Sequence, residues 1–177
     1  TANNLDNIEA VLQKFNGIVI VDEAYIDFST SGSFLNKIEQ YPNLIVMQTF
    51  SKAWGLAAAR VGMAYSNELI ISHYNKVKPP YNVSAPNQKA ALKALDNKAG
   101  FEQRKTIILE QKSWLKNQLL LVPVVLKIYP SDANFLLVRV TDAKAIYEAL
   151  LHRGIVVRLR SDALRCENCL RISVGTP

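Results

Sequence analysis

Two short apolar runs, each followed by polar residues, stand in the first third of the sequence. Residues 18–21 read Ile-Val-Ile-Val and end at Asp22, and residues 44–47 read Leu-Ile-Val-Met and lead to Lys52. The first run is rich in β-branched side chains and predicts a strand buried on both faces of a parallel sheet, and the second also predicts a buried strand. Ligands of open α/β sheets bind beyond the carboxyl ends of the strands. The polar residues at both strand ends therefore predict a ligand site.

Lys52 lies among small residues just past the second run. A lysine in a close-packed, partly dry site loses solvation, and its neutral amine is then a competent nucleophile toward an aldehyde. Gly55 and the alanines at 57–59 let a large flat ligand approach the backbone, and Arg60 offers a planar fork for a phosphate or carboxylate. A lone lysine in such a turn is more often an ordinary surface residue, so the interpretation depends on Asp22 as well.

Asp22 stands where an acid can hold a pyridinium nitrogen protonated. Pyridoxal phosphate needs that proton to act as an electron sink. Tyr25 follows three residues later, within reach of the same ligand. Many strand-end aspartates only cap the next helix, but the combination of Asp22, Tyr25 and Lys52 is much more specific than any of the three.

These residues carry a resemblance to a known family. Asp22 to Tyr25, followed by Thr49 to Ala57 with Arg60, resembles the fold-type I aminotransferases, and within them most closely the histidinol-phosphate aminotransferases. The pattern of that subfamily also fits residues 80–84, 134–135 and 170–175 in the same order. The resemblance runs over nearly the whole chain, yet it covers only about the second half of a family member.

The resemblance implies a role for each residue of the predicted site. Lys52 would bond covalently to pyridoxal phosphate and carry protons between the substrate α-carbon and C4′ of the cofactor. Asp22 would pair with the pyridine nitrogen, and Tyr25 would donate a hydrogen bond to the ring hydroxyl. Ser51 and Arg60 would hold the cofactor phosphate.

The resemblance also implies the substrates. Arg171 would receive the α-carboxylate of glutamate, and Arg158 would help bind the phosphate of the other substrate. The reaction would move an amino group between histidinol phosphate and 2-oxoglutarate, giving imidazole-acetol phosphate and glutamate in histidine biosynthesis. A homodimer is implied by the resemblance alone.

The predicted fold class is α/β, as part of the three-layer α/β/α large domain of a fold-type I enzyme, with a small α+β C-terminal domain. Residues 1–97 would form the second half of the cofactor-binding domain, 98–121 a linking helix, and 122–177 the small domain. The first helix would begin near residue 5, capped by Asn4 or Asn3. Further predictions are a short helix over 34–41 and a strand over 155–159. Thr1 would match a threonine in a turn that precedes this helix in the family.

Three alternatives stay open on the sequence. A related pyridoxal-phosphate enzyme, such as a threonine-phosphate decarboxylase or an aromatic aminotransferase, would share every cofactor residue. A non-catalytic remnant would keep the motif and bind nothing. A nucleotide-binding domain lacks support, because neither the glycine-rich dinucleotide fingerprint nor the P-loop pattern occurs.

Composition excludes other classes of function. The net charge of +6 suits small anionic substrates, and the basic residues are too scattered for a nucleic-acid interface. The apolar run at 119–126 contains Pro123 and is too short to span a bilayer, so a cytoplasmic location is expected. Cys166 and Cys169 have C-x-x-C spacing, but half a zinc motif is weak evidence, so no metal site is predicted.

Overall fold

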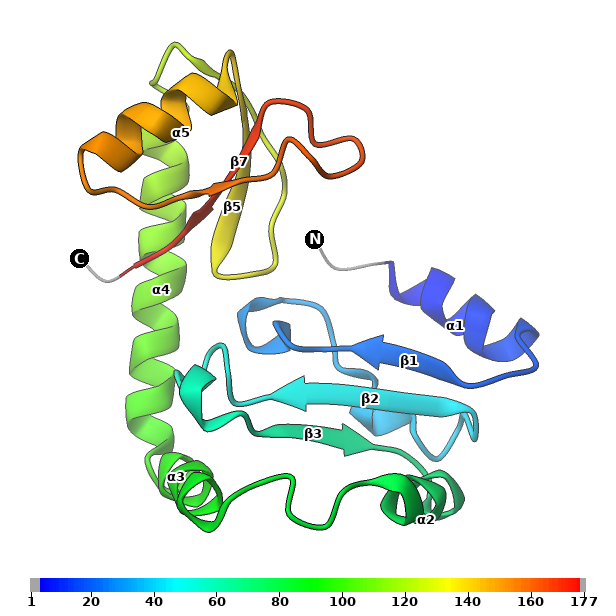
Figure 1. Cartoon of the computed structure of the whole chain (residues 1–177). Helices are drawn as coiled ribbons and strands as arrows, with labels where there is room; N and C mark the ends of the chain where they lie inside the picture. Colours follow the sequence, from blue (N-terminus) through cyan, green and yellow to red (C-terminus); the bar gives the residue numbers. More distant parts are fainter. Residues whose placement is uncertain (1–3, 176–177) are drawn as a thin grey trace. The chain divides into compact units, whose positions relative to one another are not determined.

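The computed structural model describes residues 4–175, which divide into two compact units (Figure 1). One unit extends to Gln103 and the other begins at Arg104. The long helix α4, Lys98–Leu119, crosses this boundary. The predicted domain limits at 97, 98–121 and 122–177 stay a prediction. Thr1 and Asn3, to which the sequence assigns a turn and an alternative cap, lie outside the described residues.

The first unit contains a three-stranded sheet in the order β1-β2-β3 (Figure 1). Its strands and helices are α1 (Leu5–Lys14), β1 (Val19–Asp22), β2 (Leu44–Thr49), β3 (Gly62–Tyr65), α2 (Glu68–Val77) and α3 (Ala85–Asp96). Strands β1 and β2 are parallel, with Asp22 opposite Met47, whereas β3 runs antiparallel to β2, with Gly62 opposite Thr49. The ends of β1 and β2 and the start of β3 therefore share one edge of the sheet.

Side-chain caps begin α1, α2 and α3. The Asn4 side chain accepts a hydrogen bond from the Asp6 backbone N–H at 2.8 Å, which confirms the predicted cap of α1. Asn67 caps α2 and Ser84 caps α3 in the same way. Pro86 is tolerated in the first turn of α3, where its missing N–H would have had no helical partner.

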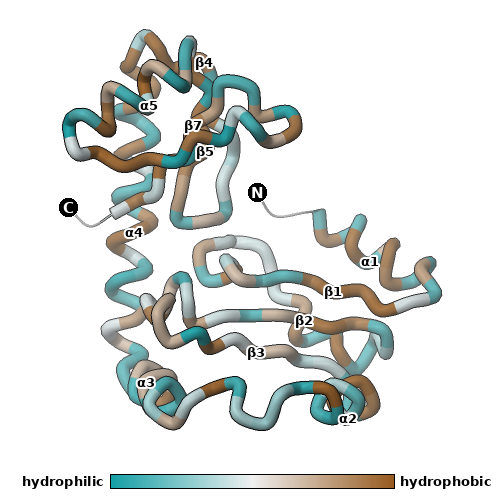
Figure 2. The backbone as a smooth tube through the Cα atoms, viewed as in Figure 1, coloured by the Kyte–Doolittle hydropathy of each residue, from teal (hydrophilic) through white to brown (hydrophobic). Residues whose placement is uncertain are grey.

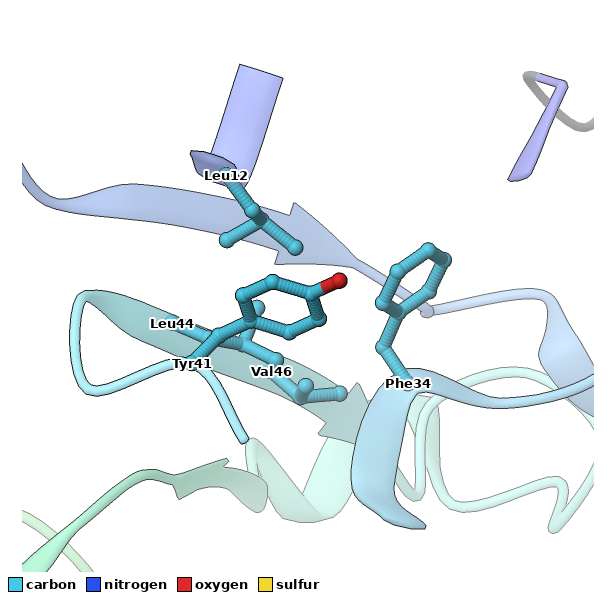
Figure 3. Packing of buried hydrophobic residues seen from close by; sticks show 5 residues of the cluster. All are labelled: Leu12, Phe34, Tyr41, Leu44 and Val46. Carbon is cyan, nitrogen blue, oxygen red and sulfur yellow. The ribbon is translucent and has the colours of Figure 1, made fainter. Parts of the chain in front are cut away.

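The core of the first unit lies on one face of the sheet. Figure 3 shows five of its side chains converging from α1, β2 and the segment between the strands: Leu12, Phe34, Tyr41, Leu44 and Val46. Val19 and Val21 of β1 pack against this cluster. A hydrogen bond of 3.1 Å from the Tyr41 hydroxyl to Glu9 keeps that buried phenol satisfied.

The expectation that the first strand is buried on both faces is wrong. Val19 and Val21 are half-buried, but Ile20 between them is 56% exposed, as is Ile18 just before the strand. Strand β1 is an edge strand, and the packed cluster covers only the valine face. Figure 2 shows apolar colouring along β1, although Ile20 of this strand is exposed.

Two local predictions also need correction. The helix expected over residues 34–41 is a single 3-10 turn, Phe34–Lys37, begun by Ser33 as its cap. The strand expected over 155–159 is only β6, Arg158–Leu159. Gly154 has φ of 74° and is followed by a turn in which Ile155 N–H donates to Leu150 O, so the chain becomes extended only later.

The second unit contains an antiparallel sheet in the order β4-β5-β7-β6. With β6, its elements are β4 (Val125–Ile128), β5 (Phe135–Val140), α5 (Ala143–His152) and β7 (Cys169–Ser173). Leu136, Val138 and Leu170 form its core, with partly buried residues of α4 and α5 packed against them. The alternation along each strand places Phe135 and Arg171 on the other face.

Lys112 of α4 holds the segment that leads into β5. Its ammonium donates to the backbone oxygens of Ser131 at 3.1 Å and Ala133 at 3.0 Å. Burial lowers the pKa of Lys112, and the nearby Asp132 opposes that shift.

None of the helices within residues 4–175 is both long enough and apolar enough to cross a membrane.

Candidate active site

The five predicted cofactor residues lie at or near strand ends on the same side of the first sheet. Asp22 is the last residue of β1, and Tyr25 lies in the turn that follows. Ser51 and Lys52 come just after β2, while Arg60 lies two residues before β3. Because β1 and β2 are parallel and β3 begins opposite the end of β2, the fold itself collects these residues.

Lys52 and Tyr25 are brought into contact. The Lys52 ammonium lies 5.2 Å from the centroid of the Tyr25 ring, and both residues are half-buried. The position of an ammonium over an aromatic face is favourable and limits the directions in which the amine points. Asp22 is exposed beside them in the chain, and one of its carboxylate oxygens accepts from the Ala24 N–H at 2.9 Å. Its other oxygen takes part in no hydrogen bond among the described residues.

Hydroxyl groups lie where the chain leaves β2. The Thr49 hydroxyl oxygen lies 3.0 Å from the Ser51 hydroxyl and 3.2 Å from the backbone oxygen of Val61. It also accepts from the Ser51 N–H at 3.1 Å. These contacts hold the Ser51 backbone in a tight turn at the strand end. The Ser51 hydroxyl is thereby fixed next to Lys52.

The segment between Lys52 and β3 contains two residues with left-handed backbone. Gly55 has φ of 72°, and nothing lies within 4 Å of the place where its Cβ would be. Arg60 has φ of 54° and ψ of 40°, is exposed, and donates through Nη1 to Ala57 O at 3.1 Å. A left-handed arginine is uncommon. The turn presents open backbone at Gly55 and an accessible guanidinium at Arg60.

The chemistry of these groups fits pyridoxal phosphate. An exposed carboxylate at Asp22 suits a protonated ring nitrogen, and the phenol of Tyr25 suits the ring hydroxyl. The amine of Lys52 suits the aldehyde. A hydroxyl at Ser51 and a planar guanidinium at Arg60 suit a phosphate. The open space at Gly55 allows a flat ring near the backbone.

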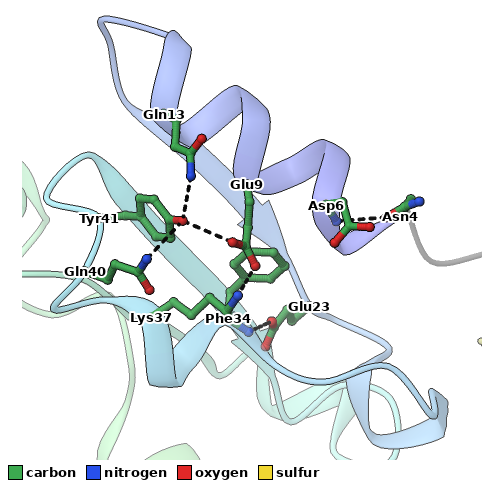
Figure 4. A network of polar contacts seen from close by, with 9 residues as sticks. All are labelled: Asn4, Asp6, Glu9, Gln13, Glu23, Phe34, Lys37, Gln40 and Tyr41. Carbon is green, nitrogen blue, oxygen red and sulfur yellow. Dashed lines mark hydrogen bonds and ion pairs between the residues drawn. The ribbon is translucent and has the colours of Figure 1, made fainter.

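Glu23, next to Asp22, is a residue whose role the sequence analysis missed. Its side chain is buried, and its carboxylate accepts from Phe34 N–H at 2.7 Å, Ser33 Oγ at 2.6 Å and Gln48 Nε2 at 2.9 Å. Figure 4 shows the bond from Phe34, near a second group of polar contacts centred on Glu9 and Tyr41.

Arg158 and Arg171 lie in the second unit, directly opposite one another on β6 and β7. The Arg171 guanidinium carbon lies 5.1 Å from the centroid of the Phe135 ring, and its Nε is buried without a hydrogen-bond partner. Among the described residues no acid forms an ion pair with either arginine. Like charges directly opposite each other in a sheet are destabilising. An anion bound between them would remove that cost.

The two cysteines are both free thiols, Cys166 half-buried and Cys169 buried. Across residues 4–175, no group of three or more His, Cys, Asp or Glu side chains has the arrangement to hold a metal ion. Cys169 lies instead against the Glu167 backbone oxygen, 3.6 Å from its sulfur. Its interaction with the Arg139 side chain raises the pKa of that guanidinium.

Comparison with known proteins places this arrangement in a family. The description "aminotransferase class I and II" belongs to the family whose sequence pattern matches residues 1–177. Histidinol-phosphate aminotransferase of Christiangramia forsetii is 52% identical over 171 residues, which are 97% of this chain and 49% of that protein. The chain spans about half the length of the curated relatives it matches.

Solved structures share the fold. The histidinol-phosphate aminotransferase of Clostridium acetobutylicum matches with a TM-score of 0.89 at 22% identity, covering 98% of this chain and 55% of that one. The histidinol-phosphate aminotransferase of Sinorhizobium meliloti, in complex with pyridoxal-5′-phosphate, matches with a TM-score of 0.78 at 26% identity, covering 89% and 44%. The predicted fold class and family resemblance are confirmed. The chain belongs to the aminotransferase class I and II family.

Proposed function

We propose that this chain is part of a pyridoxal-phosphate-dependent aminotransferase of histidine biosynthesis. It would act on histidinol phosphate and 2-oxoglutarate to give imidazole-acetol phosphate and glutamate. The observation that carries the proposal is the meeting of Lys52 with Tyr25, 5.2 Å from ammonium to ring, beyond the parallel strand that ends at Asp22. The name of the 52% identical relative supports histidinol phosphate as a substrate, and the pyridoxal-5′-phosphate in the Sinorhizobium meliloti structure supports the cofactor.

Each predicted cofactor residue at the strand ends has a defined task in this proposal. When bound, pyridoxal phosphate supplies the electron sink that stabilises a carbanion at the substrate α-carbon. The Asp22 carboxylate holds the proton on the ring nitrogen, because an opposite charge favours the charged form. Tyr25 donates its phenol to the ring hydroxyl. Ser51 and Arg60 bind the phosphate and so fix the far end of the ring.

Lys52 would hold the cofactor at its aldehyde carbon, and the amino group of the substrate would then take its place there and free its amine. That free amine would move the proton between the substrate α-carbon and C4′, which requires one group within reach of both atoms. Contact with the Tyr25 ring keeps the flexible side chain over this region. Half-burial reduces the number of waters that compete for the same proton.

The paired arginines of the second sheet would bind the anionic groups of the proposed substrates. Arg171, held against Phe135, receives the α-carboxylate of glutamate through its planar fork. Arg158, exposed and directly opposite, binds the phosphate of histidinol phosphate. Neither guanidinium has an ion-pair partner among the described residues, so anionic groups beside them are favoured over neutral ones.

Borohydride reduction of the cofactor-loaded, full-length protein tests the proposal. Peptide mass mapping should find the reduced cofactor on the peptide that contains Lys52. Lys52→Ala should abolish that adduct, whereas Lys76→Ala, a change on the exposed face of α2, should leave it intact. An adduct on another lysine, or none in wild type, contradicts the assignment.

Product analysis then decides between substrates. Formation of glutamate from 2-oxoglutarate, dependent on histidinol phosphate, supports the proposed reaction. Release of carbon dioxide from threonine phosphate, or preference for an aromatic amino acid, would favour a related enzyme of the family. A cytoplasmic homodimer belongs to the same proposal and is supported by the family resemblance.

A further inference from the structure

Glu23 is a buried acid that the proposed chemistry does not use. Glu23 is 7% exposed. Its carboxylate accepts three hydrogen bonds, from Phe34 N–H, Ser33 Oγ and Gln48 Nε2. No ion pair with this carboxylate occurs among the described residues. Burying a carboxylate is costly unless hydrogen bonds replace its water. A buried acid at this position therefore has its geometry closely fixed by its three donors.

The backbone of Glu23 is held as well. Its N–H donates to Met47 O at 2.8 Å, which extends the pairing of β1 with β2 by one residue. Its oxygen accepts from Ile26 N–H at 3.0 Å, which closes the turn containing Tyr25. Main chain and side chain together connect the end of β1, the turn after it, the segment at 33–34, and β2.

Because side chains alternate along a strand, the hydrogen bonds of Glu23 affect where Asp22 points. Glu23 shares a face with Val21, on the core side, so Asp22 between them points to the opposite face. In the neighbouring strand Gln48 lies on the core side, and Thr49 follows it on the other face. A slip of one residue would exchange the two faces. The bond between Glu23 and Gln48 opposes that slip just where Asp22 and the Lys52 turn emerge.

We propose that Glu23 is a positioning residue that, through Gln48, fixes Asp22 and Tyr25 relative to Ser51 and Lys52. The inference rests on the proposed function, because it is the cofactor that must meet all four groups at once. Small displacements of reacting groups cost large factors in rate. Weakening the anchor should therefore disturb the cofactor environment more than it disturbs the fold.

Three variants of the full-length protein test this role. Gln48→Met keeps the length of the side chain and removes the donor to Glu23. The exchange Glu23→Gln with Gln48→Glu keeps an acid and an amide facing each other with their ends reversed. Tyr41→Phe is the matched control, because it removes a hydrogen bond to another acid, Glu9, in the same core but away from the strand ends.

The readouts are the pH dependence of the visible absorbance of the lysine-bound cofactor, and kcat separately from KM. We expect Gln48→Met to shift the absorbance profile and lower kcat by about tenfold, with KM little changed. The exchanged pair should recover most of both. Tyr41→Phe should lower the thermal midpoint while leaving the profile and kcat at wild-type values.

Each contrary result has its own meaning. A wild-type profile and kcat in Gln48→Met, with only a lower thermal midpoint, overturns the positioning role and leaves Glu23 as a packing residue. An equal disturbance by Tyr41→Phe, or no recovery in the exchanged pair, overturns it too. Failure of wild type itself to carry reduced cofactor at Lys52 would instead refute the proposed function.

Discussion

Asp22 and Glu23 are adjacent acids, of which the first is exposed and the second is buried. The comparison shows which properties of a single residue the sequence predicts. The place of Asp22 at the end of a strand was predictable because a continuous apolar run ends at it, and its contact with a ligand stays a prediction. The contacts of Glu23 were not predictable, because its three donors come from Ser33, Phe34 and Gln48, which only tertiary pairing brings near. The roles of Ser51 and Arg60 came from the family resemblance and stay predictions.

The carboxylate of Asp22 gives the first prediction at this scale. Asp22→Asn keeps the size of the side chain but removes the charge that holds the proton on the ring nitrogen. An opposite charge moves a neighbouring pKa by about one to three units, so transamination should slow roughly 10- to 1,000-fold. The covalent bond to Lys52 should survive, and borohydride trapping beside steady-state kinetics measures both. Near-normal turnover at saturating cofactor would remove this role from Asp22.

Strands and helices show a different limit on what the pattern predicts. The runs at 18–21 and 44–47 indicated β1 and β2, but an apolar run cannot say whether other elements cover both faces of a strand. Ile20 is exposed because the packed cluster covers only the opposite face of β1. The 34–41 segment has a helical spacing, yet Ser33 and Phe34 are bound to Glu23, and only a 3-10 turn follows.

The direct pairing of β6 with β7 carries a prediction that belongs to the pair of strands. Arg158→Ala should raise the KM for histidinol phosphate roughly tenfold or more, since a charged hydrogen bond contributes about 1.5–3 kcal/mol. It should change the KM for glutamate less. The thermal midpoint should not fall, because the substitution removes a like charge from opposite Arg171.

Two comparison variants accompany this experiment. Arg171→Ala should weaken both substrates, since its fork would hold a group that they share or a site that both use. Arg153→Ala alters an exposed arginine at the end of α5 and should affect neither. Equal small effects of Arg158→Ala on both substrates would withdraw its assignment as a phosphate ligand.

At the scale of the molecule, the change of pattern near residue 122 indicated a second sheet, and the structure has one. The boundary between the compact units lies inside α4, after Gln103. Phe101 stacks on Trp54 with ring centroids 3.9 Å apart. A helical period shows where a helix runs, but it does not show which core each turn joins.

Division into two units predicts how local perturbations spread. Tyr41→Phe loosens a contact of the first unit, and Lys112→Met removes two hydrogen bonds of the second. Each should speed amide exchange in its own unit by roughly fivefold or more, because one hydrogen bond contributes about 1 kcal/mol. Hydrogen–deuterium exchange of the full-length protein, compared between β2 and β5 peptides, measures this. Equal acceleration in both sheets by either variant would show one cooperative unit.

The left-handed backbone of Arg60 has a consequence for how such a protein can change over evolutionary time. An L-residue with a bulky side chain in this conformation costs on the order of 1 kcal/mol, which glycine would recover. Drift toward stability therefore favours glycine there, while selection for a cation at the cofactor phosphate opposes it. Within the proposed function, Arg60 is a position where greater thermal resistance and catalysis pull in opposite directions.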